Sequence, residues 1–454
     1  MTDNKSFFGT SGIRGDAEKL FTNQFCFDLG RTFAIYLNQK GCEGGVAIGT
    51  DPRGSSPRIK SAVEKGLWYE KREVFDQGAT PVPSMCYVLQ TNPFYAGSLM
   101  VTGSHIKSNL NGLKFFINKE EILKNDEKNI EDIYTSLKET VDFSSVPGPE
   151  IHPDSSAIEE YRQMLGQLAK PYPKWKIGVD CANGSQSVVI PDLLRDLGLE
   201  ILEINCNLEE DFIARDTDTD DKAEIDDLKK LILENNCDFG IAFDGDGDRV
   251  VFLNERGEFV QGEYTCGLIA ETSSTDSVVT TVSASQLVEQ LGKKVYRTKV
   301  GSPYIIEKMK EVHSLFGFEA NGGAVSKEVS YTRDGGVTAI KILNLFADFK
   351  GKFSEMIAKL SKFYMLRTKV DYAWSQEQAI IARVREKYSD KRIDETDGLK
   401  IWLNETTWIL FRSSANAPEF RIFAESDDRE VAEKLLSDGK GLVEEVINAT
   451  LSTK

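Results

Sequence analysis

The sequence predicts an α/β protein built from several layered domains, with a C-terminal α+β module. Its 454 residues exceed what one ordinary hydrophobic core supports, which favours three or four domains. Short apolar runs typical of strands alternate with amphipathic helix patterns in three successive series. We therefore expect three α/β layered domains with mixed, mostly parallel sheets, followed by a domain that combines a strand hairpin with helices.

The first series begins with an amphipathic helix over residues 22–38. Apolar side chains recur at fourfold spacing from Phe25 to Leu37, and Thr22 is a suitable N-terminal cap. The expected elements that follow are a strand at 46–48, a helix at 56–68, a strand at 74–75, a helix near residue 84 and a strand at 96–101.

Two polar stretches, at 144–149 and 255–257, separate the later series from one another. The second series has expected strands at 176–180, 199–204 and 237–243, and expected helices at 187–197 and 225–235. The third has strands at 277–282, 294–297 and 315–318, and helices at 286–291, 303–310 and 337–360. The tail has a hairpin at 400–403 and 407–411, with helices at 376–388 and 429–450. The expected domains are residues 1–150, 151–257, 258–366 and 367–454.

Composition excludes several classes of function. A net charge of −17 disfavours a protein that binds nucleic-acid backbones, although a few local arginines can still hold a small anion. No apolar run is long enough for a signal peptide or a membrane span, so we expect no membrane association. Seven scattered cysteines without a C-x-x-C pair indicate reduced thiols, and we expect a cytoplasmic protein.

The strongest local signal is the run from Phe243 to Arg249, in which Asp244, Asp246 and Asp248 alternate with glycines. Three carboxylates at this spacing favour Mg²⁺ or another hard divalent ion. An EF-hand is disfavoured because its sixth position should be glycine but is Arg249, and because the flanks are predicted strands. A solvated acidic turn is the weaker alternative. The acidic run at 216–221 lacks the glycines, and we expect it to be such a solvated loop.

Three further loops combine small residues with groups that carry chemistry. Residues 102–114 contain a serine, a histidine and two lysines, with Asn111-Gly112 as a predicted turn. Residues 9–15 and 412–421 combine exposed backbone amides with arginines that can grip a phosphate, although neither matches the nucleotide P-loop. Taken singly, each of these loops is more typical of an ordinary turn than of a site.

Taken in order, the loops resemble the α-D-phosphohexomutase superfamily, the phosphomannomutases and phosphoglucomutases, and most of all the bacterial phosphomannomutases. The family's motifs match residues 9–15, 102–114, 244–249, 317–323 and 412–418. The resemblance covers essentially the whole chain and implies four domains around an active-site cleft. It departs from the common pattern at Lys107, Ser302 and Asn416, where a proline, a histidine and a threonine are frequent.

The resemblance implies roles for particular residues. Ser104 would carry a phosphoryl group and, with Asp244, Asp246 and Asp248, would hold one Mg²⁺ per chain. Lys114 would be the general base, with a pKa lowered by the nearby metal and arginines, while Arg14 and His105 would stabilise the transferring group. The residues that would bind substrate are Arg249, Lys299, Glu319, Asn321, Gly322, Arg412, Ser414, Asn416 and Arg421. Arg249 would orient either the phosphate or Glu319.

The function implied is the reversible conversion of mannose 6-phosphate and mannose 1-phosphate. A hexose 1,6-bisphosphate would form as the intermediate and turn around in the cleft. Glucose or glucosamine phosphate with the same mechanism is the alternative, because the sugar loop Glu319-Ala-Asn-Gly-Gly323 also resembles that of phosphoacetylglucosamine mutases. A metal-dependent phosphatase and a non-catalytic sugar-phosphate-binding protein are two further hypotheses. The expected partner is a phosphorylated hexose, and the expected state is a monomer or a weak dimer.

Overall fold

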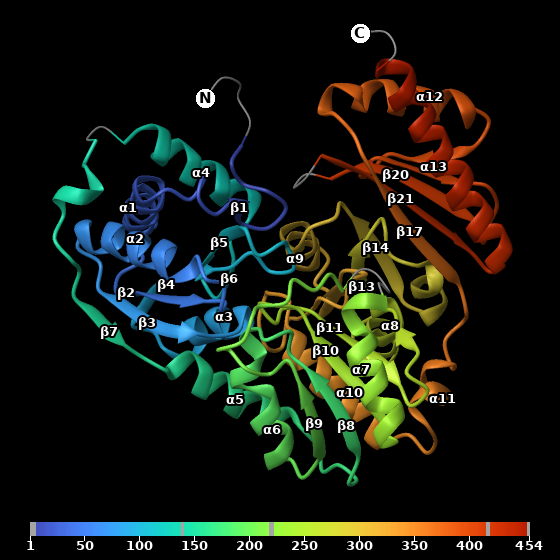
Figure 1. Ribbon diagram of the computed structural model, residues 1–454, viewed down its shortest axis with the longest axis horizontal. Coiled ribbons are helices and arrows are strands. Elements are labelled where there is room, and N and C mark those ends of the chain that lie inside the picture. Colours follow the sequence, from blue (N-terminus) through green and yellow to red (C-terminus); the bar gives the residue numbers. More distant parts are fainter. Residues whose placement is uncertain (1–5, 138–139, 218–221, 415–417, 452–454) are drawn as a thin grey trace.

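The computed structural model describes residues 6–137, 140–217, 222–414 and 418–451. Within these ranges the chain forms four β-sheets that follow one another in sequence. Figure 1 shows the N-terminal sheet and the C-terminal sheet on opposite sides of the molecule, with the second and third sheets between them. The predicted fold class, three α/β units and a C-terminal unit of different architecture, is confirmed.

The first sheet is mixed and has the order β1-β5-β4-β2-β3-β7, with β6 paired to β5. Its strands are β1 (Ile13–Asp16), β2 (Gly45–Thr50), β3 (Val74–Ala79), β4 (Tyr95–Val101), β5 (Leu110–Ile117), β6 (Glu120–Glu121) and β7 (Ile151–Pro153). Its helical segments are α1 (Asn23–Gln39), α2 (Ser56–Tyr69), α3 (Val82–Thr91), α4 (Lys124–Thr135) and the 3-10 turn η1 (Phe143–Ser145). The predicted cap of α1 is confirmed, because Thr22 Oγ1 accepts a hydrogen bond from Phe25 N at 3.2 Å.

Alternating side chains of the first sheet enter two separate cores. On β2, Val46 and Ile48 pack with α1 and α2, whereas Ala47 packs with α3 on the other face. On β4, Leu99 lies in the core shared with α1 and α2, and Met100 lies in the core shared with α3. Because side chains alternate between the two covered faces of this sheet, β2 and β4 are buried throughout.

The second and third sheets share one hydrophobic core. The second is formed by β8 (Lys176–Asp180), β9 (Glu200–Ile204), β10 (Phe239–Phe243), β11 (Val250–Asn254) and β12 (Phe259–Val260), and the third by β13 (Ser277–Thr281), β14 (Lys294–Thr298), β15 (Phe316–Phe318) and β16 (Ala324–Ser326). The helical segments are α5 (Ser156–Leu168), η2 (Ser185–Val188), α6 (Ile190–Asp196), α7 (Lys222–Asn235), α8 (Gly262–Thr272), η3 (Gln286–Leu291), α9 (Ser302–Glu311), α10 (Gly335–Ala347) and α11 (Phe353–Ile357). Phe239 and Phe252 of the second sheet pack in one cluster with Phe346 and Phe353 from the third unit. The two units therefore form a continuous middle section.

The fourth sheet is antiparallel, with the order β17-β21-β20-β19-β18. Its elements are β17 (Tyr364–Asp371), η4 (Trp374–Gln376), α12 (Glu377–Lys387), β18 (Arg392–Asp394), β19 (Leu399–Trp402), β20 (Trp408–Ser413), β21 (Glu419–Ser426) and α13 (Arg429–Leu451). The predicted hairpin at 400–403 and 407–411 corresponds to β19 and β20, and both predicted helices of the tail are present. The domain boundaries at 150, 257 and 366 stay predictions, and β7 extends the first sheet just past the first of them.

Three expected elements differ from the structure. The single helix expected at 337–360 is two helices, α10 and α11, because Gly351 adopts a φ of +150° in the connection. The segment at 286–291 is a 3-10 helix and not an α-helix. Asn111 and Gly112, predicted to form a turn, lie inside β5, where a Cβ on Gly112 would be 2.4 Å from the carbonyl oxygen of Thr102. The glycine serves a close strand contact there.

No helix in the described ranges has the length and apolar character needed to cross a bilayer. The seven cysteines all lie in described segments, and none forms a disulfide.

One connection in each sheet joins neighbouring antiparallel strands and carries a predicted motif. The serine loop (residues 102–109) joins β4 to β5, and the aspartate loop (244–249) joins β10 to β11. The sugar loop (319–323) joins β15 to β16, and the phosphate loop (414–418) joins β20 to β21. Such connections are short, so each fixes its loop at one end of a rigid hairpin.

The close approach of α1 and α2 predicts a stability effect. A Cβ on Gly66 of α2 would lie 2.0 Å from the backbone oxygen of Phe27 of α1, so Gly66→Ala forces the helices apart. We expect a destabilisation of about 1–3 kcal/mol, measured by thermal or denaturant unfolding. Gly166→Ala in α5 is the matched control, because its Cβ would meet only Leu193 at 3.7 Å. Equal stability of Gly66→Ala and the wild type would contradict this account of the helix contact.

Candidate active site

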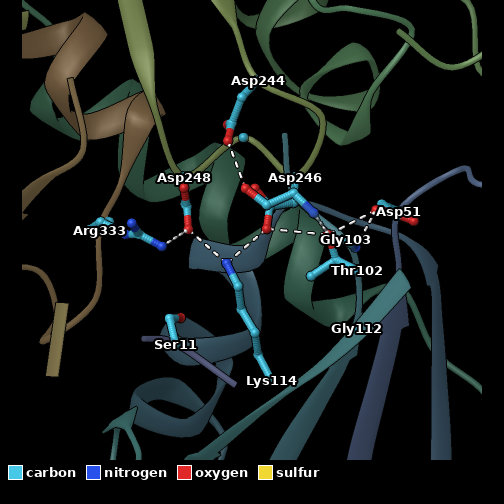
Figure 2. Close-up of polar contacts among 12 residues, drawn as sticks. Ser11, Asp51, Thr102, Gly103, Gly112, Lys114, Asp244, Asp246, Asp248 and Arg333 are labelled. Atoms are coloured by element: carbon cyan, nitrogen blue, oxygen red, sulfur yellow. Dashed lines mark hydrogen bonds and ion pairs between the residues drawn. The ribbon is translucent and has the colours of Figure 1, made fainter. Parts of the chain in front are cut away.

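The aspartate loop between β10 and β11 brings three carboxylates together. Asp244, Asp246 and Asp248 are at most 1% exposed, and one oxygen from each lies within 4.8 Å of the others. Gly247 has a φ of +71°, which compacts the turn, and Figure 2 shows the three side chains converging. The predicted cluster is therefore present as a buried triad on a strand–turn–strand hairpin, and not as a solvated acidic turn.

The electrostatics of the triad fit a cation. Asp246 Oδ1 and Asp248 Oδ1 are buried without a hydrogen-bond donor. Burial, with repulsion from the other two carboxylates, raises the pKa of Asp244 well above its ordinary value. Burial opposes ionisation of Asp248 too, but Arg333, Lys114 and Arg249 hold its pKa below the ordinary value. Clustered carboxylate oxygens, two of them without a donor, suit Mg²⁺.

Ser104 lies against this triad. Its Oγ donates to Asp244 Oδ2 at 3.0 Å and is 3.3 Å from His105 Nδ1. The backbone of Ser104 has a φ of +54°, a left-handed conformation that is strained for a residue with a side chain. The predicted nucleophile and the predicted metal ligands therefore meet although they come from different sheets.

Arg53, which sequence reasoning missed, holds the serine loop in this conformation. The guanidinium donates to four backbone carbonyls, those of Ser104, Ile106, Lys107 and Leu110, at 2.6–3.0 Å. Its Nε pairs with Asp51 Oδ2 at 3.0 Å, and the side chain is fully buried. These contacts offset the cost of the strained backbone at Ser104.

Lys114 of β5 points between two members of the triad (Figure 2). Its Nζ donates to Asp246 Oδ2 and to Asp248 Oδ2, each at 2.7 Å. Burial would lower the pKa of Lys114, but the two carboxylates outweigh it and raise the pKa above its ordinary value. The lowered pKa was expected for Lys114 beside a metal, and it stays a prediction, because a cation among the carboxylates would offset their charge.

A polar pocket next to the serine is lined from all four sheets. Its charged lining comprises five arginines and one glutamate: Arg14, Arg249, Arg333, Arg412, Arg421 and Glu319. His105, Asn321 and Ser414 line it too. Burial and the surrounding arginines lower the pKa of His105 well below its ordinary value, so its imidazole is neutral near pH 7. The cleft expected between the domains is therefore a local positive region in a protein of net charge −17.

Three residues that were predicted to bind substrate are not among these described lining residues. Lys299 is exposed and is not among the lining residues, although Val300 follows it in the wall. Gly322 packs against β11, where a Cβ would be 2.1 Å from the backbone oxygen of Val250. Asn416 lies outside the described residues.

Arg333 is the second residue that sequence reasoning missed. It contacts Asp248 and Glu319, so it occupies the place beside Glu319 that was one of the two alternatives expected for Arg249. Arg249 instead lies 3.7–3.8 Å from Asp248 and Asp244. The local sequence around Arg333 indicates only the start of a helix, because Asp334 is a suitable N-cap. Asp334 does cap α10.

The acidic run at 216–221 is not simply solvated at its start. Asp216 lies 3.9 Å from Arg249. Thr217 is buried and donates to the backbone oxygen of Asn321 in the sugar loop at 2.8 Å. These two residues contact residues that line the pocket, and the rest of the run, 218–221, lies outside the described residues.

Four hairpin loops around an acidic triad and an arginine-lined pocket define a multidomain α/β enzyme for phosphorylated substrates. Comparison with known proteins specifies the family. Three models of the phosphoglucomutase/phosphomannomutase family match the chain, alpha/beta/alpha domain I over residues 5–141, domain II over 156–257 and domain III over 261–364.

Individual relatives match along nearly the whole chain. A phosphoglucomutase/phosphomannomutase of Thermococcus kodakarensis is 33% identical over 97% of this chain and 99% of its own. A phosphoglucosamine/phosphogalactosamine mutase of Sulfurisphaera tokodaii is 31% identical over 96% and 99%. The chain belongs to this family, the phosphohexomutases, and is an isomerase of the intramolecular phosphotransferase type.

Solved structures share the fold at lower identity. A putative phosphomannomutase from Thermus thermophilus has a TM-score of 0.80 at 21% identity, covering 96% of this chain and 98% of that one. An N-acetylphosphoglucosamine mutase from Aspergillus fumigatus, in complex with GlcNAc-6P and magnesium, has a TM-score of 0.60 at 14% identity, covering 97% and 96%.

Proposed function

We propose that this phosphohexomutase is a Mg²⁺-dependent phosphomannomutase that interconverts mannose 6-phosphate and mannose 1-phosphate through a phosphoserine at position 104. The observation that carries the proposal is the contact of Ser104 with Asp244 inside a buried triad that has unpaired carboxylate oxygens. The relative whose structure contains magnesium supports this choice of ion. The cytoplasmic location and the monomeric or weakly dimeric state remain predictions.

In the first half-reaction, the bond between phosphorus and Ser104 Oγ breaks and a bond to a sugar hydroxyl forms. The hydroxyl proton passes to Lys114, whose neutral form a cation among the aspartates would favour by offsetting their charge, and Arg14 and neutral His105 hold the transferring group. Mg²⁺, when bound by the three aspartates and the phosphoserine, supplies charge that stabilises the departing serine oxygen.

The second half-reaction needs the same centre to receive the other phosphate of the hexose 1,6-bisphosphate. Arg412, Ser414 and Arg421 line the pocket on the side contributed by the fourth sheet. Forked guanidinium groups bind phosphates at either end of a sugar equally well, since they recognise the oxyanion and not the carbon that bears it. These three residues, with Asn416, are proposed to hold the phosphate that is not being transferred.

The charge of the pocket favours a neutral sugar. Glu319 is the one carboxylate among the described lining residues, and it is already paired with Arg333. A protonated 2-amino group would therefore meet five arginines and no uncompensated carboxylate. The specific observation in favour of an amino sugar is the match to the Sulfurisphaera tokodaii mutase, so a phosphoglucosamine mutase is the second candidate.

A steady-state comparison of mannose, glucose and glucosamine 1-phosphates tests the substrate. We expect kcat/KM for mannose 1-phosphate to exceed that for glucosamine 1-phosphate at least about tenfold, a difference of roughly 1.4 kcal/mol in transition-state binding. The reverse order would replace the proposal with the second candidate. Release of inorganic phosphate without isomerisation would indicate a phosphatase, and absence of turnover with all three sugars would favour a binding protein.

A further inference from the structure

Arg333 joins two loops of the site through a single buried side chain. It is 3% exposed, and its two terminal nitrogens contact different carboxylates. One donates to Asp248 Oδ2 at 2.7 Å and the other to Glu319 Oε2 at 2.5 Å. Figure 2 shows the guanidinium directed at Asp248, beside the carboxylate oxygen that Lys114 also contacts. One planar group therefore links the aspartate loop to the sugar loop.

The backbone that carries Arg333 is fixed independently of its side chain. Arg333 forms an isolated antiparallel bridge with Val325 of β16, and the next residue, Asp334, donates from its N–H to the Ala324 oxygen at 2.9 Å. Asp334 also caps α10, and Tyr161 of α5 donates its hydroxyl to the Asp334 carboxylate at 2.5 Å. The guanidinium is thus presented from a frame anchored in both the second and the third unit.

The sugar loop leaves room for this side chain. A Cβ on Gly323 would lie 2.7 Å from Arg333 Cδ and 3.1 Å from Asn321 Oδ1. The absence of a side chain at Gly323 therefore leaves room for the side chain of Arg333, whose guanidinium reaches Glu319.

We infer that Arg333 is a positioning residue that fixes the Glu319 carboxylate relative to Asp248, and so sets the place of the sugar ring relative to the phosphoryl-transfer centre. The inference rests on the proposed function, in which Glu319 binds sugar hydroxyls and Asp248 belongs to that centre. Because the bisphosphate binds in two orientations, one rigid link serves both half-reactions. A displacement of about 1 Å at such a position costs roughly 10²-fold in rate.

The Arg333→Met variant keeps an extended side chain but removes the charge and both contacts. We expect kcat/KM to fall about 10²-fold, with a rise in KM as well as a loss in kcat, because Glu319 loses its anchor. Mg²⁺ binding without sugar, measured by titration calorimetry, should be unchanged or tighter, because Asp248 keeps Lys114 and loses a competing cation. A residue that served only folding would weaken metal binding and sugar binding together.

A double-mutant cycle with Glu319→Gln tests whether Arg333 acts through Glu319. In the Glu319→Gln background, adding Arg333→Met should raise KM by less than about threefold, because the carboxylate that Arg333 positions is gone. Arg333→Lys should recover part of the loss, since one ammonium can reach one of the two carboxylates, and it replaces the methionine variant if that protein does not fold. Arg256→Met removes an exposed arginine paired with Glu258 and should leave KM unchanged.

Several results would overturn the inference: independent, additive effects of Arg333 and Glu319 on KM, an unchanged KM in Arg333→Met, or weaker Mg²⁺ binding in that variant. A wild-type protein that carries no phosphate on Ser104 and does not isomerise sugar phosphates would overturn the proposed function instead. The two failures are therefore distinguishable in the same set of measurements.

Discussion

Replacing Ser104 with alanine is expected to lower kcat for sugar-phosphate isomerisation by at least about four orders of magnitude. The variant lacks the oxygen that accepts and returns the phosphoryl group. The fold of the loop should persist, because Arg53 and Thr102 contact Ser104 through its backbone oxygen and N–H. Within the described part of the chain, the hydrogen-bond partners of its hydroxyl are Asp244 and His105. Loss of activity can therefore be assigned to the missing hydroxyl.

Intact-mass measurement supplies a second readout for Ser104. The wild type should carry one phosphate that sugar phosphates can remove, whereas Ser104→Ala should carry none. Ser108→Ala is the matched control, because Ser108 is an exposed serine of the same loop. Substantial turnover by Ser104→Ala, or a phosphate that persists in it, would eliminate Ser104 as the phosphoryl carrier.

Local sequence patterns predicted most of the fold because they depend on local physics. The cap at Thr22 and the fourfold apolar spacing determine α1, and apolar runs determine the buried strands. Where the prediction was wrong, a backbone feature without a local signature decided the outcome. Gly351 divides the expected helix at 337–360, and Gly112 lies in a strand because β5 passes close to Thr102. Among the strands that were not predicted are β17, β18 and β21 of the fourth sheet.

The residues of the candidate site, too, were predictable only where the signal is local in the sequence. The aspartate triad was predictable because three carboxylates separated by glycines carry their chemistry within a few residues. Arg53 and Arg333 were not, because each acts through long-range contacts with loops that are remote in sequence. The pKa of Lys114 without a bound cation was not predictable for the same reason. Its two aspartate partners come from another sheet, more than a hundred residues away along the chain.

Replacing Asp246 with asparagine is expected to weaken Mg²⁺ binding and to lower the isomerisation rate by about two to three orders of magnitude. Asp246 offers one oxygen to Lys114 and leaves the other unpaired and buried, so its charge is available to a cation. Asparagine has nearly the same shape, and the backbone oxygen of Asp246 still accepts from Val82 N at 2.9 Å. The loop should therefore keep its place while the site loses one negative charge.

The metal dependence of Asp246→Asn separates a ligand from a merely structural aspartate. Titration calorimetry should record weaker Mg²⁺ binding, and raising the Mg²⁺ concentration should restore part of the activity by mass action. Asp227→Asn on the exposed surface of α7 removes the same charge outside the triad and should behave as the wild type. A wild-type Mg²⁺ dependence in Asp246→Asn would contradict the ligand assignment. The three carboxylates would then be a purely structural cluster that Lys114 and Arg333 neutralise, and phosphoryl transfer would need another source of positive charge.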